Sequence, residues 1–385
     1  MRYAAALILA PGLACAQVEQ GPKNADFEPA FENQTRAPAL PESAVTVETF
    51  AEGLANPWGI AELPDGSFLV TERPGTLRRV SAQGEVSDPV SGVPEVDARD
   101  QGGLLDVAIA PDFAQTGTIF LTYAKRVDGG TVTAAARATL DGDALSDVTE
   151  IFIQDPPSSV PKHYGSRVVP TDDGMVYITT GEHSSDATRV LAQDNSTTYG
   201  KIIRLNADGS VPQDNPFVGQ DGVDSIWSYG HRNVQGADIG PDGALWTMEH
   251  GPAGGDELNR PEPGLNYGWP VISYGIRYGG GPIGSGEAVM EGMEQPVYYW
   301  DPVIAPGGIG FYDGDYADWQ GDLFVAGLNP GALVRLKLQD GRVSGEERLL
   351  RDVGRVRDVE VLSDGDLMVL IDADPGSILR VTPQR

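Results

Sequence analysis

The stretch LSDGDLMVLIDAD, residues 362–374, carries the pattern that decides the fold. A turn built on Asp-Gly precedes a strand of β-branched and apolar residues, and glycine stands where such turns need a positive φ. The pattern recurs about every 45 to 80 residues, and its other five copies begin at Leu63, Ala110, Pro170, Gly240 and Asp318. Six β units of this size predict a six-bladed β-propeller.

A second strand follows each turn unit, and it often ends in arginine plus an apolar residue, as in GTLRRV, GKIIRL, GALVRL and GSILRV. No long stretch shows a helical period of 3.6 residues. We therefore expect an all-β propeller of four-stranded antiparallel blades. The segment VTVETF, residues 45–50, is expected to complete the last blade beside GSILRV. Two packed β-sandwiches remain the alternative architecture.

The overall charge excludes two classes of partner. The chain has 385 residues and carries 27 Lys plus Arg against 56 Asp plus Glu, a formal net charge of −29. A protein this acidic offers no broad basic face to a nucleic acid or to an anionic membrane surface. Hydrophobic residues make up 40% of the chain, which is enough for a sizeable core.

The N-terminus resembles an export signal. Residues 1–16 combine one positive charge, a short apolar stretch and small residues at Ala14 and Ala16, which predicts a cleaved secretory signal peptide and a periplasmic or secreted protein. A lipoprotein acylated at Cys15 is the alternative. Residues 17–43 are polar and aperiodic and are expected to form a linker or arm. Residues 44–385 are expected to form one propeller domain, and no segment is long enough to span a membrane.

Four histidines, His163, His183, His231 and His250, all lie in loops or at strand ends near the repeats. Their spacing argues against a zinc site, because no close His/Cys ligand spacing is present. His163 precedes a repeat strand and Glu182 follows it, so the two side chains can meet across one blade. A carboxylate beside an imidazole is the arrangement of a general base, although two unrelated polar loop residues would look the same in sequence.

Two glycine-containing segments offer further binding groups. GHRNVQG, residues 230–236, places Arg232 and Asn233 between glycines that allow a ligand to approach closely. EHGPAGGDELN, residues 249–259, offers bare carbonyls and carboxylates, the hard oxygen ligands that suit Ca²⁺. An ordinary acidic turn is the alternative for the second segment.

Five arginines form a local exception to the acidic composition. They fall within 16 residues, at Arg342, Arg348, Arg351, Arg355 and Arg357. Such a cluster indicates an anionic partner, because arginine binds carboxylates in a bidentate manner. Pairing with the neighbouring acidic residues is expected for some of the five.

Taken together, these segments resemble the soluble aldose sugar dehydrogenases that use pyrroloquinoline quinone (PQQ). The resemblance covers residues 45–381 and is carried, in order, by PWGI, QGGLLDVAIAPDF, HYGSR, GKIIRLNADGSVPQDNPF, GHRNVQG, EHGPAGGDELN, NYGWP and RVRDV. It implies PQQ- and Ca²⁺-dependent oxidation of an aldose at C1 to the lactone, with hydride transfer to PQQ and an external electron acceptor.

The resemblance also implies roles for single residues. The catalytic group would be His163 as general base, Glu182 as its partner and Arg232 as a stabiliser of negative charge. The cofactor-binding positions would be Gln101, Arg232, Asn233, Tyr278, Asn329, Arg355 and Arg357. The Ca²⁺ positions would be Gly251, Pro252, Asp256, Glu257 and Tyr267.

One position departs from the family pattern. Asn329 stands where the family usually has a lysine that grips a PQQ carboxylate, so cofactor binding is expected to be weaker unless Lys162 or another arginine compensates. A Ca²⁺-dependent lactonase propeller and a non-enzymatic glycan- or protein-binding propeller remain the rival functions. The sequence does not distinguish a monomer from a homodimer, and it names neither the physiological sugar nor the natural electron acceptor.

Overall fold

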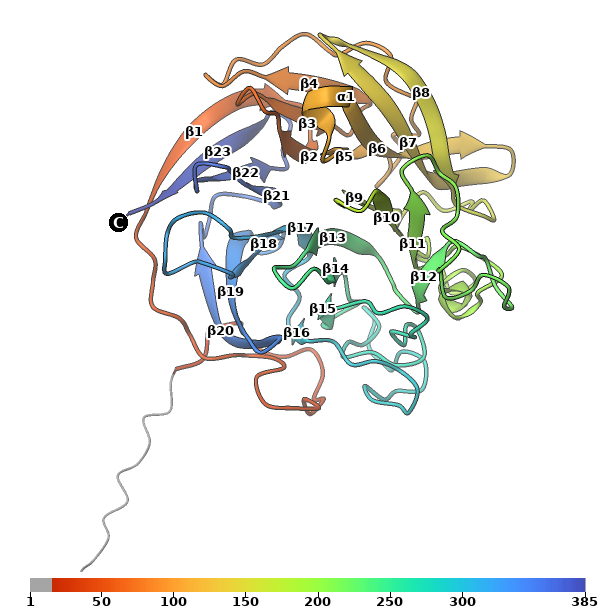
Figure 1. Ribbon diagram of the computed structural model, residues 1–385. Helices are drawn as coiled ribbons and strands as arrows, with labels where there is room; N and C mark the ends of the chain where they lie inside the picture. The colour runs from red at the N-terminus through yellow and green to blue at the C-terminus, as the bar shows by residue number, and fades with distance from the viewer. Residues whose placement is uncertain (1–15, 385) are drawn as a thin grey trace, which may run out of the picture.

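The computed structural model describes residues 16–384, which form six antiparallel sheets arranged as blades around a central channel (Figure 1). The prediction of an all-β, six-bladed propeller is confirmed. The blades, in chain order, are β2 (Pro57–Glu62), β3 (Phe68–Glu72), β4 (Thr76–Val80); β5 (Leu104–Ile109), β6 (Thr118–Val127), β7 (Gly130–Asp141), β8 (Ala144–Ile153); β9 (Gly165–Pro170), β10 (Met175–Thr180), β11 (Lys201–Asn206), β12 (Ile226–Tyr229); β13 (Val234–Ile239), β14 (Leu245–Glu249), β15 (Asp256–Asn259), β16 (Tyr298–Trp300); β17 (Pro306–Phe311), β18 (Leu323–Gly327), β19 (Ala332–Gln339), β20 (Arg342–Leu349); and β21 (Val356–Val361), β22 (Leu367–Ile371), β23 (Gly376–Pro383) with β1 (Val45–Leu54). The short helical segments are α1 (Phe113–Thr116) and the 3₁₀ turn η1 (Arg189–Gln193).

Every repeat turn joins the first strand of a blade to its second strand. The turns at Gly66, Gly174, Gly243 and Gly365 have φ between 76° and 87°, the left-handed region that the Asp-Gly pattern predicts. The ring closes through β1, which pairs with β23 in the register Val47↔Val381, as expected for residues 45–50. The ring is therefore closed by one blade that contains both the first and the last strand of the chain.

The first blade has three strands where four were predicted. Residues 81–96 follow β4 and contain Pro89 and Pro94, which have no backbone N–H to donate to a ladder. The segment makes only isolated bridges, Val80↔Val86 and Ser91↔Ala144. The second of these reaches the outer strand of the next blade.

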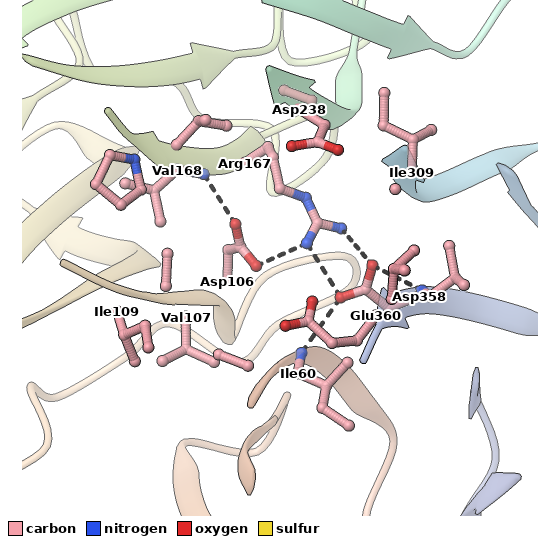
Figure 2. A pocket seen from close by; sticks show the side chains of 18 of the residues that line it. Ile60, Asp106, Val107, Ile109, Arg167, Val168, Asp238, Ile309, Asp358 and Glu360 are labelled. Carbon is pink, nitrogen blue, oxygen red and sulfur yellow. Dashed lines mark hydrogen bonds and ion pairs between the residues drawn. The ribbon is translucent and has the colours of Figure 1, made fainter. Parts of the chain in front are cut away.

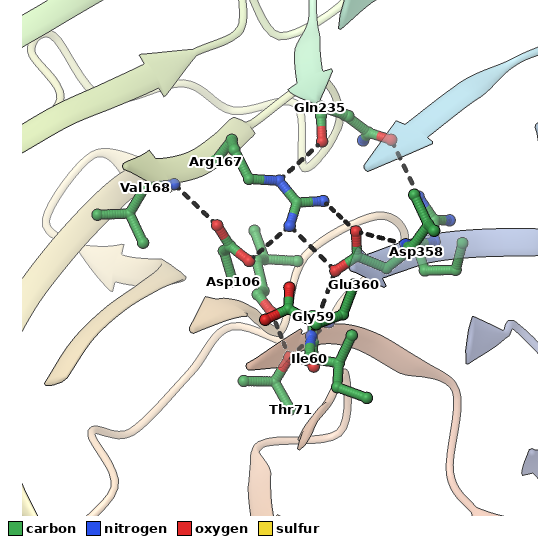
Figure 3. Close-up of polar contacts among 12 residues, drawn as sticks. Gly59, Ile60, Thr71, Asp106, Arg167, Val168, Gln235, Asp358 and Glu360 are labelled. Atoms are coloured by element: carbon green, nitrogen blue, oxygen red, sulfur yellow. Dashed lines mark hydrogen bonds and ion pairs between the residues drawn. The ribbon is translucent and has the colours of Figure 1, made fainter. Parts of the chain in front are cut away.

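Adjacent blades are held together by apolar clusters between their faces and by polar contacts between their inner strands. In the channel, Arg167 of β9 donates to Asp106 of β5 at 2.7 Å and to Asp358 of β21 at 3.1 Å (Figure 2). The same carboxylates accept backbone N–H groups of Val168 and Ile60 (Figure 3). Each of these acids therefore ties its own strand to the first strand of another blade.

Residues 16–43 form an arm that docks on the fourth and fifth blades. The side chain of Gln34 is fully buried and donates to the Pro296 carbonyl, and Ala39 pairs with Glu346 of β20. The predicted signal peptide falls almost entirely on residues outside the described range. In the described part, no helix is long and apolar enough to cross a membrane.

Candidate active site

The loops that precede the first strands and those that follow the second strands meet at one face of the ring. Each first strand runs from this face to its repeat turn, and the second strand returns to it. The sequence-predicted site residues lie in these loops or at the adjoining strand ends, apart from two on the long segment between β15 and β16. The loop and strand-end residues are Gln101, His163, Glu182, Arg232, Asn233, Gly251, Pro252, Asp256, Glu257, Asn329, Arg355 and Arg357, and the other two are Tyr267 and Tyr278.

His163 and Glu182 form a buried pair at this face. His163 Nδ1 lies 2.9 Å from Glu182 Oε1, and the second carboxylate oxygen accepts the Ser184 N–H at 2.7 Å. The His163 side chain is 9% exposed and that of Glu182 is 1% exposed. When Nδ1 carries the proton and donates it to Glu182, Nε2 keeps a free lone pair.

Burial determines the protonation state of this pair. Burial lowers the pKa of His163 well below its usual value, and the positive charges of Arg232, Lys162 and Arg189 lower it further. Burial also raises the pKa of Glu182 to about 7, while Arg232 opposes that shift. The imidazole is therefore neutral at neutral pH, which is the form that can accept a proton.

Two amide side chains hold the backbone around His163. Gln101 Oε1 accepts the His163 N–H at 2.9 Å, and Asn233 Oδ1 accepts the Gly165 N–H at 3.0 Å. Both residues come from loops of neighbouring blades. They fix the position of the imidazole relative to the channel mouth.

Arg232 brings a buried positive charge that forms no ion pair within 4 Å with an acid of residues 16–384. Its Nη1 donates to the His250 carbonyl at 2.9 Å, its Nε has no partner among residues 16–384, and the guanidinium lies 5.1 Å from the Trp269 ring centroid. Buried arginines are rarely left without an acid, so this side chain favours an anionic ligand.

Arg355 and Arg357 share one carboxylate. Asp372 Oδ2 lies 3.3 Å from Arg355 Nε and 3.1 Å from Arg357 Nη2, and Gln235 Oε1 accepts from Arg357 Nη1 at 3.0 Å. Two cations against one anion leave a positive surplus, and Arg357 Nε also lacks a partner within the described residues. The backbone carbonyl of Gln235 accepts from Arg167 and links this group to the channel (Figure 3).

The other three arginines of the sequence cluster do not belong to the site. Arg348 pairs with Glu346 at 2.9 Å, Arg342 stacks on Phe31 of the arm at 4.0 Å, and Arg351 is exposed. The expected pairing with a neighbouring acid is confirmed for Arg348. The register of β20 and its following turn carries all three to the outer edge of the fifth blade.

The loop that follows β14 gathers oxygen atoms around a small cavity. The cavity is lined by Glu249, Gly251, Pro252, Glu257 and Tyr267, among others. Burial and the nearby Glu249 raise the pKa of Glu257 well above its usual value, and within residues 16–384 no basic side chain pairs with Glu257. Asp256 holds the loop instead, since its carboxylate accepts the N–H groups of Gly251, Ile304 and Ala305 at 2.7 to 2.8 Å.

Two cofactor-binding predictions fall on exposed residues. Tyr278 is 79% exposed on the segment between β15 and β16, and Asn329 is exposed just after β18. Neither side chain is buried at the channel mouth in this structure.

Several residues of the site were not predicted from the sequence. They are Asp372, Glu249, Gln235, His250, Trp269 and Arg189. The repeat contained a signal for Glu249 and Asp372. An acidic residue stands at or just after the end of the second strand in four blades, and each of these acids pairs with a basic side chain. The pairs are Glu72–Arg78, Glu182–His163, Glu249–His231 and Asp372–Arg357.

The polar groups at this face fit both PQQ and Ca²⁺, the cofactor and the metal ion that the resemblance implies. A ligand with several carboxylates matches the unpartnered nitrogens of Arg232 and Arg357. Carbonyl and carboxylate oxygens of the loop after β14 match Ca²⁺, although no group of three or more His, Cys, Asp or Glu side chains in residues 16–384 is placed to hold a metal ion.

Comparison with known proteins gives one consistent result. The glucose/sorbosone dehydrogenase family model matches residues 54–380. The aldose sugar dehydrogenase YliI of Escherichia coli K12 is 42% identical over 352 residues, covering 89% of this chain and 94% of that protein. The crystal structure of the soluble aldose sugar dehydrogenase from Escherichia coli in the apo-form superposes with a TM-score of 0.85 at 41% identity, over 89% of this chain and all of that one. The PQQ-bound aldose sugar dehydrogenase of Streptomyces coelicolor does so with a TM-score of 0.74 at 29% identity, over 90% of this chain and all of that one.

Proposed function

The chain belongs to the glucose/sorbosone dehydrogenase family, and from that premise we propose that it oxidises aldose sugars at C1 to the lactone with PQQ and Ca²⁺. One observation carries the proposal. A neutral, buried imidazole with a free Nε2 stands at the same face as arginines that lack a full complement of acids.

His163 would act as the general base. Its Nε2 would take the proton of the anomeric hydroxyl while Nδ1–H continues to donate to Glu182. As the imidazole becomes positively charged, the Glu182 carboxylate stabilises it and keeps the ring in one orientation. Gln101 and Asn233 hold the backbone of this loop, so the base does not need to move during the reaction.

Bound PQQ would supply an ortho-quinone that accepts the hydride from the sugar. Arg232 and Arg357 would bind its carboxylate and quinone oxygens, with Arg355 at the exposed edge. Buried guanidinium groups are strong partners for such anions because little water screens them. The carbonyls of Gly251 and Pro252, with Glu257 and the Tyr267 carbonyl, would hold Ca²⁺.

We also propose a cellular setting for this reaction. Residues 1–16 would direct export to the periplasm or the exterior, with acylation at Cys15 as the alternative, and reduced PQQ would pass its electrons to an external acceptor. The chain would work as a monomer or a homodimer.

Reconstitution tests the function against its rivals. Purified protein is incubated with PQQ and Ca²⁺, and reduction of an artificial electron acceptor is followed with glucose and other aldoses. The proposal predicts reduction only when PQQ and a sugar are both present. Lactone hydrolysis without PQQ would instead support a lactonase, and neither activity would support a binding propeller.

A further inference from the structure

The loops that carry His163 and Glu182 are held in an unusual backbone conformation. His163, His183 and Ser184 have φ of 48°, 60° and 53°, in the left-handed region that side chains other than glycine seldom adopt. The two loops also lie in close contact, because a Cβ added at Gly181 would stand 1.9 Å from the His163 carbonyl oxygen. Such a conformation persists only where the surroundings hold it.

His183 is the side chain that contacts both loops. Its ring is fully buried, with Nδ1 3.1 Å from the Val160 carbonyl in the loop before His163. Its Nε2 lies 2.7 Å from Gln154 Oε1, and Gln154 Nε2 donates to the Gly181 carbonyl at 2.8 Å. The His183 N–H also points at the His163 carbonyl at 3.4 Å.

The orientation of Gln154 is fixed by its other partners. Its Oε1 accepts the Thr133 N–H at 3.2 Å, and its Nε2 donates to the Thr198 carbonyl at 3.3 Å as well as to Gly181. Both nitrogens of His183 therefore face oxygen acceptors. The ring donates to at least one of them in any protonation state, and an apolar replacement removes that donor and leaves Gln154 Oε1 with the Thr133 N–H alone.

Aromatic rings close the remaining sides of His183. Tyr164, the residue after His163, meets it edge to face with centroids 5.1 Å apart, and Tyr199 does so at 5.2 Å. The ring thus has no room to turn away from its two acceptors.

We propose that His183 is a positioning residue, which locks the two loops so that His163 Nδ1 meets Glu182 and Nε2 stays aimed at the reacting hydroxyl. This inference rests on the proposed function for its kinetic consequence. Its geometric part does not depend on any activity.

Substitutions at His183 separate positioning from general stability. His183→Asn keeps an amide donor near the Val160 carbonyl, His183→Gln keeps one near Gln154, and His183→Leu keeps neither. The first readout is the Nδ1 proton resonance of His163 in the ¹⁵N-labelled full chain. We expect it in the wild type and in His183→Asn, and we expect it to be lost in His183→Leu. The matched control is Gln34→Leu, which removes a fully buried polar side chain of the arm and should leave that resonance in place.

The second readout is steady-state kinetics of the PQQ- and Ca²⁺-loaded enzyme. We expect kcat in His183→Leu to fall at least about tenfold while the sugar KM stays within about twofold, because small misplacement of a base is costly to rate. If His183→Leu does not fold, the Asn and Gln variants decide, and Asn should retain the higher kcat.

The outcomes divide cleanly. Folded His183→Leu that keeps both the His163 resonance and kcat overturns the inference. If the Leu variant does not fold, Asn and Gln variants with the same kcat overturn it. A wild-type enzyme without sugar oxidation defeats the proposed function, and the resonance still tests the positioning role.

Discussion

At the scale of single residues, burial sets the chemistry of this face more than any single ion pair does. His163 is buried and His250 is half-buried, and desolvation lowers the pKa of each well below its usual value, with Arg232 adding to both shifts. The positive charges nearby help to keep the His163 imidazole neutral. Under the proposed function, the same charges would also bind the anionic cofactor.

The pH dependence of turnover follows from the lowered pKa of His163. Protonation removes the base, so kcat/KM falls on the acid side as pH drops through the pKa of His163, and burial moves that point well below 6.5. A pH–rate profile of the loaded enzyme should therefore show its acid inflection below pH 6.5, with circular dichroism confirming that the protein stays folded. An acid inflection at 6.5 or above would contradict this.

Arg357 should matter for cofactor affinity. Replacing it with methionine removes charge-assisted hydrogen bonds worth about 1.5–3 kcal/mol, so we expect the PQQ Kd to rise about 10- to 100-fold. Saturating PQQ should restore most of kcat. The matched control is Arg351→Met, which changes an exposed arginine of the same sequence cluster and should leave the Kd unchanged. Equal Kd values in the two variants would remove Arg357 from the binding site.

The sequence allowed part of this site to be predicted. His163 and Glu182 flank the hairpin of β9 and β10, which brings the residue before its first strand and the residue after its second strand to the same end. Composition alone does not separate the site arginines Arg355 and Arg357 from the other three of the cluster. The position of each side chain depends on where β20 ends and β21 begins. Gln235 carries no chemical signature, and only the meeting of three blades gives it its partners.

At the scale of elements, the repeat turns and the closing strand were predictable because each depends on local turn chemistry and a period-2 pattern. Residues 16–43 and 81–96 were not, since they pack through individual side chains and isolated bridges that leave no periodicity in the sequence. The arm is also linked to the site through Asp301. Its carboxylate accepts four hydrogen bonds from Asn24 and Ala25 at 2.7 to 3.0 Å and lies against Gly254 of the loop after β14.

Removing the anchor of the arm should destabilise the whole domain. Asp301→Ala removes the buried carboxylate that accepts bonds from the exposed Asn24 and the half-buried Ala25, and a hydrogen bond to a charged group contributes about 1.5–3 kcal/mol, so we expect the free energy of unfolding to fall by about 1.5–3 kcal/mol. Denaturant unfolding measures this. Glu28→Ala changes an exposed acid of the same arm and is the control. Indistinguishable midpoints for the two variants would show that the arm is not held through Asp301.

At the scale of the whole molecule, the net charge is −29. Arg232, Arg355 and Arg357 lie at the face that carries His163. The channel below it is lined by acids around one arginine, in a cavity of about 340 Å³ (Figure 2). Burial raises the pKa of Asp106 to about 7, that of Asp238 to about 6 and that of Glu360 to about 8. Between about pH 4.5 and the raised pKa values, these three carboxyl groups therefore keep protons in the folded protein that the unfolded chain would release.

Stability should consequently depend on pH through Glu360. Because its folded pKa is raised from 4.5 to about 8, its contribution to stability is present in full below pH 4.5 and is lost as pH rises toward 8. Glu360→Gln cannot ionise, so its Tm should match the wild type near pH 4.5 and exceed it increasingly up to pH 8. Glu48→Gln, at an exposed position of β1, is the control. A Tm difference that stays constant with pH would contradict the prediction.

The central claim is that His163 removes the proton from an aldose in a PQQ-dependent oxidation. The most direct measurement compares wild type and His163→Ala, both loaded with PQQ and Ca²⁺ to a measured occupancy, by their rates of acceptor reduction with glucose. We predict equal PQQ occupancy and a kcat at least about 100-fold lower in the variant, since a general base contributes roughly 10²–10⁴-fold. A fully loaded His163→Ala enzyme that turns over at the wild-type rate would contradict the claim.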